Sequence, residues 1–531
     1  MNYDLRPGQP KGQFRIYNSE FIILFLTLVC LLLPTRNSTL DAWYYAACVR
    51  HEHELLLPHH LLYNPAGLLW TRLLSGLGLS LDTLAALKML NALAAGASLW
   101  VLLRILRQLK QPEPMVMAWV LVVGASFGMM RFATENEAYV LPVLFSLLGS
   151  LCWTRYQVAA LPRPALLVWA GLGAAGACLF HQIHFFWWLG LLLGTAWTAE
   201  KKRRDILLYT LPALLVPAAY VAALPVWHEP FTLPALWRFV FHDYYAGLAG
   251  GSVSVQGGLL TVVNLGRTFL QVHGSLPALL RAVPLLAVVP LLCAFLFGWA
   301  GLTGWRAFRA RAATPAADLT RPVELAAVGH THGLILLAQL AFAAYAAGNA
   351  EFMVMVPALV AIAFSQLRWV PARSLTALGG GLLLWNLAFG LGPAHFLRFT
   401  NTDKLLTAIP AQPQAWFLLD NHNLVLNQLH YRTGNPVNPA NVWPAPTLLV
   451  QRAGQSPARF RAWVRGQQRA GHRLFTDCLG GPKLLDRAQI VYGDQNAALL
   501  QPFRTVRIDS FATFSGPRYL TEILPPIATP E

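Results

Sequence analysis

A polar stretch directly after the first apolar run of the chain carries the side chains best suited to chemistry. This stretch, residues 36–67, reads RNSTLDAWYYAACVRHEHELLLPHHLLYNPAG and follows the apolar residues 21–33. Its acidic and imidazole side chains are Asp41, His51, Glu52, His53, Glu54, His59 and His60. A carboxylate can accept a proton from an attacking hydroxyl, and imidazoles can bind phosphate, sugar or metal. Such groups are costly to keep at a membrane, so they usually mark function there.

Asp41 stands a few residues after the apolar run and precedes WYYAAC, which is typical of an amphipathic helix start. Taken alone, the residue allows two interpretations. It is a general base for an incoming hydroxyl, or it caps a helix or lies solvated in a loop. The neighbouring histidines favour the general base.

The run HEHELLLPHH at 51–60 allows three interpretations. Glu and His at this density, with His51 and His53, can hold a divalent metal, although the H-E-x-x-H spacing is absent because position 55 is Leu. A hydrogen-bonding surface for phosphate or sugar is the second, and a polar helix lying on the membrane is the third. Pro58 fixes the turn before His59 and His60, so we expect these imidazoles to be held in place. Tyr63 and Asn64 follow as further candidates.

A second acidic segment, MRFATENEAYVLP at 130–142, lies between two apolar runs. Glu135 and Glu137 need partners at a membrane edge, and Arg131 precedes Glu135 by one helical turn. A structural ion pair of Arg131 with Glu135 is one interpretation. In the functional one, Glu137 or Glu135 holds an acceptor or metal, and Arg131 holds a phosphate.

Three further segments place polar side chains at helix ends. In FHQIHFFWW (180–188), His181 and His184 share one helix face, which favours either a phosphate or sugar site or ordinary hydrogen-bonded histidines. The loop 237–258 holds His242 and Asp243 among aromatic residues and glycines, as a lid or as an interfacial anchor. Glu351 follows Asn349 at another helix end.

The composition indicates which kind of structural element positions these residues. The chain has 531 residues, 56% hydrophobic and 12% charged, against roughly 25% charged in soluble domains. This predicts an all-α polytopic membrane protein with about eleven membrane helices, because the apolar segments are continuous and do not alternate as barrel strands do. The expected spans are 18–35, 82–103, 114–132, 138–154, 164–181, 183–199, 206–226, 282–303, 331–348, 351–367 and 375–396.

The net charge of +16 does not indicate nucleic-acid binding, because the basic residues cluster between apolar runs. Alternate loops carry the clusters, beginning with Arg6, Lys11 and Arg15 and including KKRR at 201–204. The pattern predicts a cytoplasmic N-terminus, an uncleaved first span, and an outer position for residues 36–67 and for the tail.

The tail changes in composition. Residues 397–531 alternate short apolar runs with helical patterns, which predicts a small extracytoplasmic α/β domain after a membrane domain at 1–396 with outer loops 36–81 and 227–281. Asp420 and Asp477 end predicted strands, where sites often form, although a loop or cap role is the plainer interpretation. Cys48 and Cys478 could share the outer compartment and pair. Gly171-x-Gly173-x-x-Gly176 lies inside a span and indicates close helix packing, not a dinucleotide site.

Together these segments resemble a family, the GT-C membrane glycosyltransferases, in particular the protein O-mannosyltransferase-like branch. The likeness rests on Asp41 just after the first span and on Pro58-His59-His60 with Tyr63-Asn64-Pro65, which stand where that branch has a His-Pro-Pro-Gly-like element. ATENEAYVLP is similar to its Glu-x-Tyr stretch at the fourth span, and LFHQIH to its histidine at the end of the fifth. The resemblance covers roughly residues 15–400. The His-Pro-Pro-Gly element is degenerate, and a single Asp stands where that branch has an acidic pair.

The resemblance implies a hexosyl- or mannosyltransferase that takes a sugar from a polyprenyl-phosphate donor with inversion. Asp41 would be the base, and Glu137 and Glu135 would contact acceptor or metal. The donor phosphate and sugar would fall to His59, His60, Arg131, His181 and His184. The acceptor would be a protein, glycan or lipid, a divalent metal is the one cofactor left open, and the location would be a bacterial inner (plasma) membrane.

Two other functions fit the same composition. A transporter or flippase of lipid-linked sugar would place charged residues near the middle of spans and show internal repeats. The acidic residues instead lie mostly at span ends, and no repeat is evident. A non-catalytic membrane scaffold would use the tail to bind partners.

Overall fold

Each of the eleven predicted spans is helical over most of its length in the computed structural model, which describes residues 18–198, 201–246, 250–272, 275–312, 323–366, 370–452, 456–480 and 487–525. A small C-terminal sheet follows them. The predicted fold class, a helical membrane-type body with a small C-terminal α/β unit, is confirmed. Arg6, Lys11 and Arg15, on which the predicted orientation rests, lie outside the described residues.

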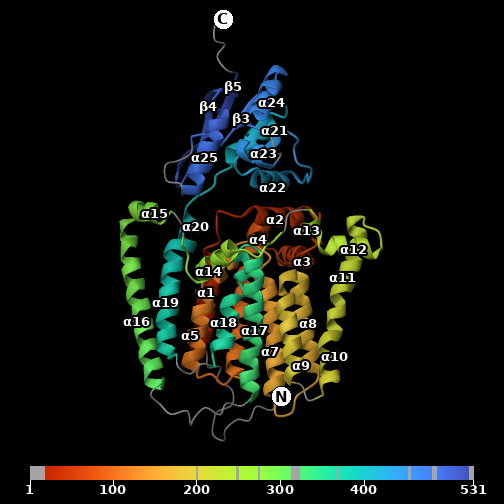
Figure 1. Ribbon diagram of the computed structural model, residues 1–531, viewed down its shortest axis with the longest axis vertical. Helices are drawn as coiled ribbons and strands as arrows, with labels where there is room; N and C mark the ends of the chain where they lie inside the picture. The colour runs from red at the N-terminus through yellow and green to blue at the C-terminus, as the bar shows by residue number, and fades with distance from the viewer. Residues whose placement is uncertain are drawn as a thin grey trace.

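The helical body stands as a bundle of roughly parallel helices (Figure 1). Its helices are α1 (Asn18–Leu32), α4 (Thr83–Gln108), α5 (Glu113–Gly124), α6 (Phe127–Ala133), α7 (Val140–Val158), α8 (Ala165–Phe180), α9 (Phe185–Thr198), α10 (Lys202–Thr210), α11 (Leu215–Ala223), α16 (Val288–Ala312), α17 (Val323–Tyr345), α18 (Val356–Phe364), α19 (Ala372–Asn386) and α20 (Gly392–Phe396). Short 3-10 or π turns continue several of them: η1 (Gln182–His184), η2 (Leu211–Leu214), η3 (Leu224–Trp227), η4 (Pro284–Ala287), η6 (Ala350–Met353) and η7 (Leu387–Leu391).

Within the described ranges, five helical segments are long and apolar enough to cross a membrane, and a sixth is counted if α5 and α6 form one span with a 62° bend. The predicted span 114–132 is therefore not one straight helix. Ser126 stands at the break, and its Oγ donates to Val123 O at 2.6 Å. A serine hydroxyl that takes a backbone acceptor in this way competes with the helical hydrogen bond.

Glycines allow α7 and α8 to pack backbone to backbone. A Cβ added to Gly173 would lie 2.7 Å from Gly149 N and 3.0 Å from Phe145 O. A Cβ on Gly171 would lie 2.2 Å from Tyr209 O, on α10. The glycine-rich stretch therefore serves close helix packing, as its position inside a span indicated.

One end of the bundle is capped by short helices: α2 (Leu40–His51), α3 (Tyr63–Gly76), α12 (Leu233–Val240), α13 (His242–Tyr245), α14 (Val255–Phe269) and α15 (Leu276–Ala282). The C-terminal unit lies beyond them, with α22 (His422–Thr433) nearest to α2 (Figure 1). The Trp43 and Tyr431 rings meet edge to face at 5.1 Å, and Asn427 Nδ2 donates to Leu40 O at 2.8 Å. The segment carrying Asp41 is thus enclosed between bundle and C-terminal unit.

The C-terminal unit is built on a five-stranded sheet in the order β2-β1-β3-β5-β4. Its strands are β1 (Trp416–Leu419), β2 (Val442–Pro444), β3 (Leu474–Thr476), β4 (Arg504–Thr513) and β5 (Gly516–Leu524), and its other helices are α21 (Asp403–Ala411), α23 (Pro446–Arg452), α24 (Pro457–Arg469) and α25 (Arg487–Leu500). Strand β1 pairs in parallel with β2 and β3, whereas β5 is antiparallel to β3 and β4.

Asp420 and Asp477 follow β1 and β3 directly, at the carboxyl ends of two paired parallel strands. Asp477 Oδ1 accepts the Asp420 N–H at 2.8 Å, and Asp420 is held by Arg518 at 2.8 Å. Both carboxylates therefore serve local structure. Cys48 and Cys478 are both free, so the disulfide considered between them is not formed.

Candidate active site between the bundle and the C-terminal unit

Asp41 lies in the first turn of α2 and is not the residue that caps it. Thr39 is the N-cap, and its Oγ1 accepts the Ala42 N–H at 3.1 Å. Among the described residues, none donates a hydrogen bond to the Asp41 carboxylate. Burial raises the pKa of Asp41 to about 6, with contributions from the charges of Glu351 and Asp243. A carboxylate with this pKa is ionised at neutral pH and is a better base than an exposed aspartate.

Glu137 is buried, and its Oε1 accepts a hydrogen bond from the hydroxyl of Thr39, the residue that caps α2. Burial raises the pKa of Glu137 well above its usual value, with contributions from the charges of Asp41 and Glu351. The two acids from distant segments therefore lie close enough to influence each other. A neutral carboxylic acid at this position can both donate and accept hydrogen bonds.

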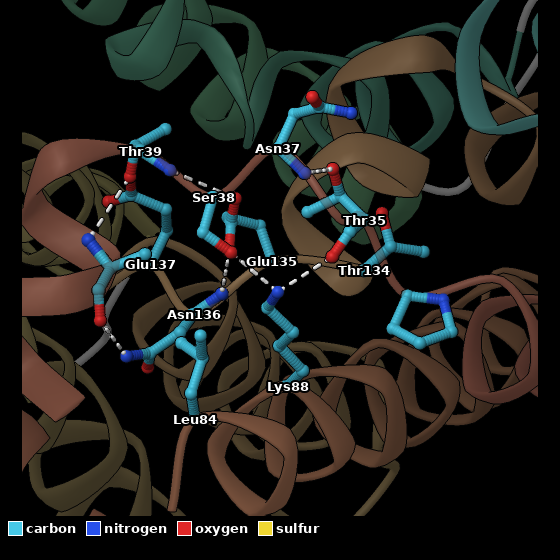
Figure 2. Close-up of polar contacts among 12 residues, drawn as sticks. Thr35, Asn37, Ser38, Thr39, Leu84, Lys88, Thr134, Glu135, Asn136 and Glu137 are labelled. Carbon is cyan, nitrogen blue, oxygen red and sulfur yellow. Dashed lines mark hydrogen bonds and ion pairs between the residues drawn. The ribbon is translucent and has the colours of Figure 1, made fainter. Parts of the chain in front are cut away.

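Glu135 pairs with a residue that the sequence did not single out. Lys88, on α4, lies 3.6 Å from Glu135 Oε1, and both side chains are almost fully buried (Figure 2). The expected ion pair of Arg131 with Glu135 is wrong. Helix α6 ends at Ala133, so the two residues are not one helical turn apart, and the Arg131 guanidinium lies over the Phe132 ring at 4.9 Å.

Two buried asparagines hold the segment 134–139 in place. Asn91 Nδ2 donates to Glu135 O at 2.7 Å and to Glu137 O at 2.8 Å. Asn136 Nδ2 donates to Ala42 O at 2.6 Å, while its Oδ1 accepts from the Tyr63 hydroxyl at 2.7 Å. Tyr63, proposed from sequence as a site residue, is thus a buried member of this scaffold.

Asn64 is also enclosed in the scaffold. It is completely buried, and its Nδ2 lies 3.5 Å from Glu54 O, at the limit of a hydrogen bond. One signal could have revealed the scaffold, since Lys88 and Asn91 are polar residues three apart in an otherwise apolar predicted span.

A histidine pair from separate segments meets beside these acids. The rings of His60 and His181 lie 4.4 Å apart, and His59 stacks edge-on against His60 at 4.6 Å. Tyr139 lies 5.0 Å from the His181 ring, and Tyr45, on the same helix as Asp41, lies 5.7 Å from His60. The structure therefore brings residues 59–60 and 181 to one place at the end of the bundle.

His60 is the most deeply buried of these imidazoles on the 36–67 segment. Its Nδ1 is buried without a partner among the described residues. Burial lowers the pKa of His60 well below its usual value, and burial also lowers that of His59. At neutral pH, His60 therefore offers a hydrogen bond but no positive charge.

His184 faces in another direction from the His60–His181 pair. Its Nδ1 lies 2.7 Å from the Ser146 hydroxyl on α7, and its ring stacks on Trp187. The one-face expectation for His181 and His184 fails because a 3-10 turn, η1, begins directly after His181. His184 contacts the interior of the bundle.

The segment with His242 and Asp243 contacts His59, next to the histidine pair. Asp243 Oδ2 lies 3.2 Å from His59 Nε2, and its other oxygen lies 3.1 Å from His242. Gln182 joins the chain just before His242 to the turn at Pro58. Its Nε2 donates to Val240 O at 2.8 Å and to Pro58 O at 3.1 Å.

Glu351 completes the group from the far end of the sequence. The Tyr139 hydroxyl donates to Glu351 Oε2 at 2.9 Å, and Asn349 Oδ1 accepts the Glu351 N–H at 3.0 Å. With Asp41, Glu137 and Asp243, this makes four acids from four segments at the same end of the bundle.

His51 and His53 do not join this group. The His51 ring stacks at 6.1 Å on His430 of α22, and the His53 ring meets His430 edge-on at 6.3 Å. Glu54 accepts from Tyr44 at 2.5 Å. These residues form an interface with the C-terminal unit. Over the described ranges, no three His, Cys, Asp or Glu side chains are placed to hold a metal ion.

No protein-family profile matches the chain, and no curated protein matches its sequence. Solved structures do resemble it. ArnT from Cupriavidus metallidurans, bound to undecaprenyl phosphate, is 11% identical, with 97% of this chain and 99% of that chain covered and a TM-score of 0.48. The oligosaccharyltransferase of Archaeoglobus fulgidus, tethered with an acceptor peptide, is 12% identical, with 95% and 74% covered and a TM-score of 0.50. At this identity the second likeness shows that the chain and this oligosaccharyltransferase have a common fold.

Proposed function

We propose that this protein is an integral membrane glycosyltransferase that transfers a sugar from a polyprenyl-phosphate donor to an acceptor hydroxyl with inversion. The single observation that carries the proposal is the position of Asp41. It is a half-buried carboxylate whose pKa is raised to about 6, without a hydrogen-bond donor among the described residues, at the same end of the bundle as the His60–His181 pair.

The fold and the site support the same chemistry. The oligosaccharyltransferase that shares this fold is tethered with an acceptor peptide, which supports a transferase that takes a separate acceptor. A site at the end of apolar helices suits a lipid-linked donor, because the polyprenyl tail stays among hydrocarbon while the sugar reaches the polar cap.

The reaction is a single displacement. Asp41 accepts the proton of the acceptor hydroxyl as its oxygen attacks the anomeric carbon. The bond from that carbon to the donor phosphate oxygen breaks, and the polyprenyl phosphate leaves with the electron pair. Neutral His60 and His181 donate hydrogen bonds towards the departing phosphate, which stabilises charge where it develops.

Glu137 and Glu351 shape the site around the base. As a neutral acid, Glu137 donates to and accepts from hydroxyls of the bound sugar or acceptor. Glu351 stays near enough to raise the pKa of Asp41. We assign the site to the outer face and the N-terminus to the cytoplasm on the alternation of basic loops.

The proposal is tested with purified protein in lipid vesicles, a panel of radiolabelled polyprenyl-phosphate sugars and membrane extracts as acceptor. Asp41→Asn is expected to remove transfer while the protein still folds, and Asp41→Glu to retain a small part of it. Asp403→Asn is the matched control, because Asp403 is an exposed residue of α21 paired with Arg398. Unchanged transfer by Asp41→Asn, or no transfer by the wild-type protein from any donor, would refute the proposal.

A further inference from the structure

Lys88 is a buried cation that the proposed reaction does not use. It lies in the second turn of α4, and only 8% of its side chain is exposed. Removing an ammonium group from water is costly unless its hydrogen bonds are replaced. The sequence therefore keeps a charge at a position where an apolar residue would pack more easily.

Two hydrogen bonds and one ion pair hold the Lys88 ammonium. Nζ donates to Thr35 O at 2.7 Å and to Ser38 Oγ at 2.5 Å, and it lies 3.6 Å from Glu135 Oε1. Figure 2 shows the amine pointing into the ring of polar atoms formed by these residues. All three of these contacts are made to other residues of the chain.

These acceptors belong to the two segments that carry the acids of the site. Residues 35–39 lead into α2 and Asp41, and residues 134–139 carry Glu137. The segments are also joined directly, since Thr35 N donates to Thr134 O at 3.1 Å and Thr39 N donates to Glu135 Oε2 at 3.2 Å. Lys88 lies between them and contacts both.

The same contacts continue to the reacting group. Glu135 receives the Thr39 N–H, Thr39 caps α2, and the Thr39 hydroxyl donates to Glu137. Loss of the Lys88 ammonium would leave Thr35 O and Ser38 without their donor and Glu135 without its counter-charge. The α2 cap would then be free to shift relative to Glu137.

We propose that Lys88 is a positioning residue that fixes Asp41 relative to Glu137 by clamping residues 35–39 to residues 134–139. The inference rests on the proposed function for its kinetic consequence, but the clamp itself is independent of the reaction. Geometry errors of about 1 Å at a reacting group cost roughly a hundredfold in rate. The clamp therefore acts on kcat more than on substrate binding.

The test compares Lys88→Met, Lys88→Arg and the charge-balanced double variant Lys88→Met/Glu135→Gln. The double variant avoids a buried unpaired carboxylate, and melting temperature in detergent confirms that it folds. Lys404→Met is the control, because Lys404 forms an exposed pair with Asp509 in the C-terminal unit. In the folded double variant, kcat is expected to fall roughly tenfold to a hundredfold with KM nearly unchanged.

The pH profile separates positioning from a change of charge. In Lys88→Met, the unpaired Glu135 carboxylate raises the pH at which activity appears, whereas the double variant keeps the wild-type midpoint with a lower plateau. Lys88→Arg keeps the charge without the three-way contact, so it is expected to fold and to keep the midpoint with a lowered kcat. A double variant with wild-type kcat would overturn the kinetic role of Lys88.

Hydrogen exchange of the peptide covering 35–45, followed by mass spectrometry, tests the clamp without turnover. Faster exchange in the folded double variant is expected, and unchanged exchange would overturn the clamp. A wild-type protein that transfers no sugar would overturn the proposed function instead, so the two failures are distinguishable.

Discussion

The Tyr139 hydroxyl donates a 2.9 Å hydrogen bond to Glu351 Oε2 and joins the start of α7 to η6, 212 residues later in the chain. This contact keeps the Glu351 carboxylate beside Asp41, whose pKa it helps to raise. The base of the proposed reaction is therefore tuned by a residue from the last third of the bundle.

The first prediction concerns pH. Asp41 must be ionised to act as base, so kcat/KM of the wild-type protein should rise with pH through a midpoint near 6. Glu351→Gln removes a negative charge near Asp41, which favours the ionised form and should move the midpoint to lower pH. The measurement is a pH profile of kcat/KM, with Asp403→Asn as control. A midpoint that stays in place or rises would contradict the assignment.

The second prediction concerns the loop at 237–246. Asp243 contacts His59 at 3.2 Å, so Asp243→Ala should release the loop from His59. A partly exposed pair of this kind contributes about 0.2–1 kcal/mol, so KM for the donor should rise by roughly two- to fivefold. Hydrogen exchange in the loop should increase. Arg238→Gln, an exposed change on α12, should alter neither quantity, and equal effects of both changes would refute the contact as the cause.

A third prediction addresses helix packing. Gly173→Ala places a Cβ 2.7 Å from Gly149 N, against backbone that cannot rotate away. Overpacking of this kind costs about 1–3 kcal/mol, so the melting temperature in detergent should fall. Gly298→Ala on α16 is the matched control, since a Cβ there has no neighbour within 4 Å. Equal melting temperatures for the two variants would show that α7 and α8 are not in close contact.

A fourth prediction concerns the C-terminal unit. Burial raises the pKa of Asp477 to about 6, so the folded state binds a proton that the unfolded state has released. Stability contributed by this group is therefore lost as pH rises from the unfolded pKa to about 6. Asp477→Asn cannot ionise and should raise the melting temperature at about pH 7.5, but not at about pH 4.

Asp509 serves as the comparison, because its pKa is shifted in the opposite direction from that of Asp477. The Ser510 N–H and Lys404 lower the pKa of Asp509, so its carboxylate favours the folded state at higher pH. Asp509→Asn should therefore not stabilise the protein at about pH 7.5. A stabilising effect from both changes would point to a general charge effect, not to burial of Asp477.

The helical body was predictable because continuous apolar runs in lipid leave the backbone few alternatives. The break between α5 and α6 was not, since apolar residues stand on both sides and the small residues Gly124 and Ser126 also occur inside straight helices. The partner of Glu135 was missed because helix spacing reveals neighbours within one helix, whereas Lys88 lies on a different one.

The histidines of residues 36–67 divide into two groups for a local reason. Helix α2 ends at His51, and Glu52 and Glu54 then adopt positive φ values of 52° and 49°. Left-handed turns are commonly signalled by glycine or asparagine, and neither occurs here. The chain therefore turns at Glu52 and Glu54 without a glycine or asparagine to signal it, which sends His51 and His53 to α22 and His59 and His60 to the bundle.

The contact of α22 with α2 has a consequence for how the chain can be divided. Tyr431 meets the Trp43 ring on one side, lies under the Arg50 guanidinium, and donates to Asp82. Cutting the chain near residue 397 would expose that aromatic surface to water and loosen the very helix on which Asp41 stands. The tail is therefore no detachable appendage, and a shortened protein that lost activity would report a damaged scaffold before it reported a missing binding partner.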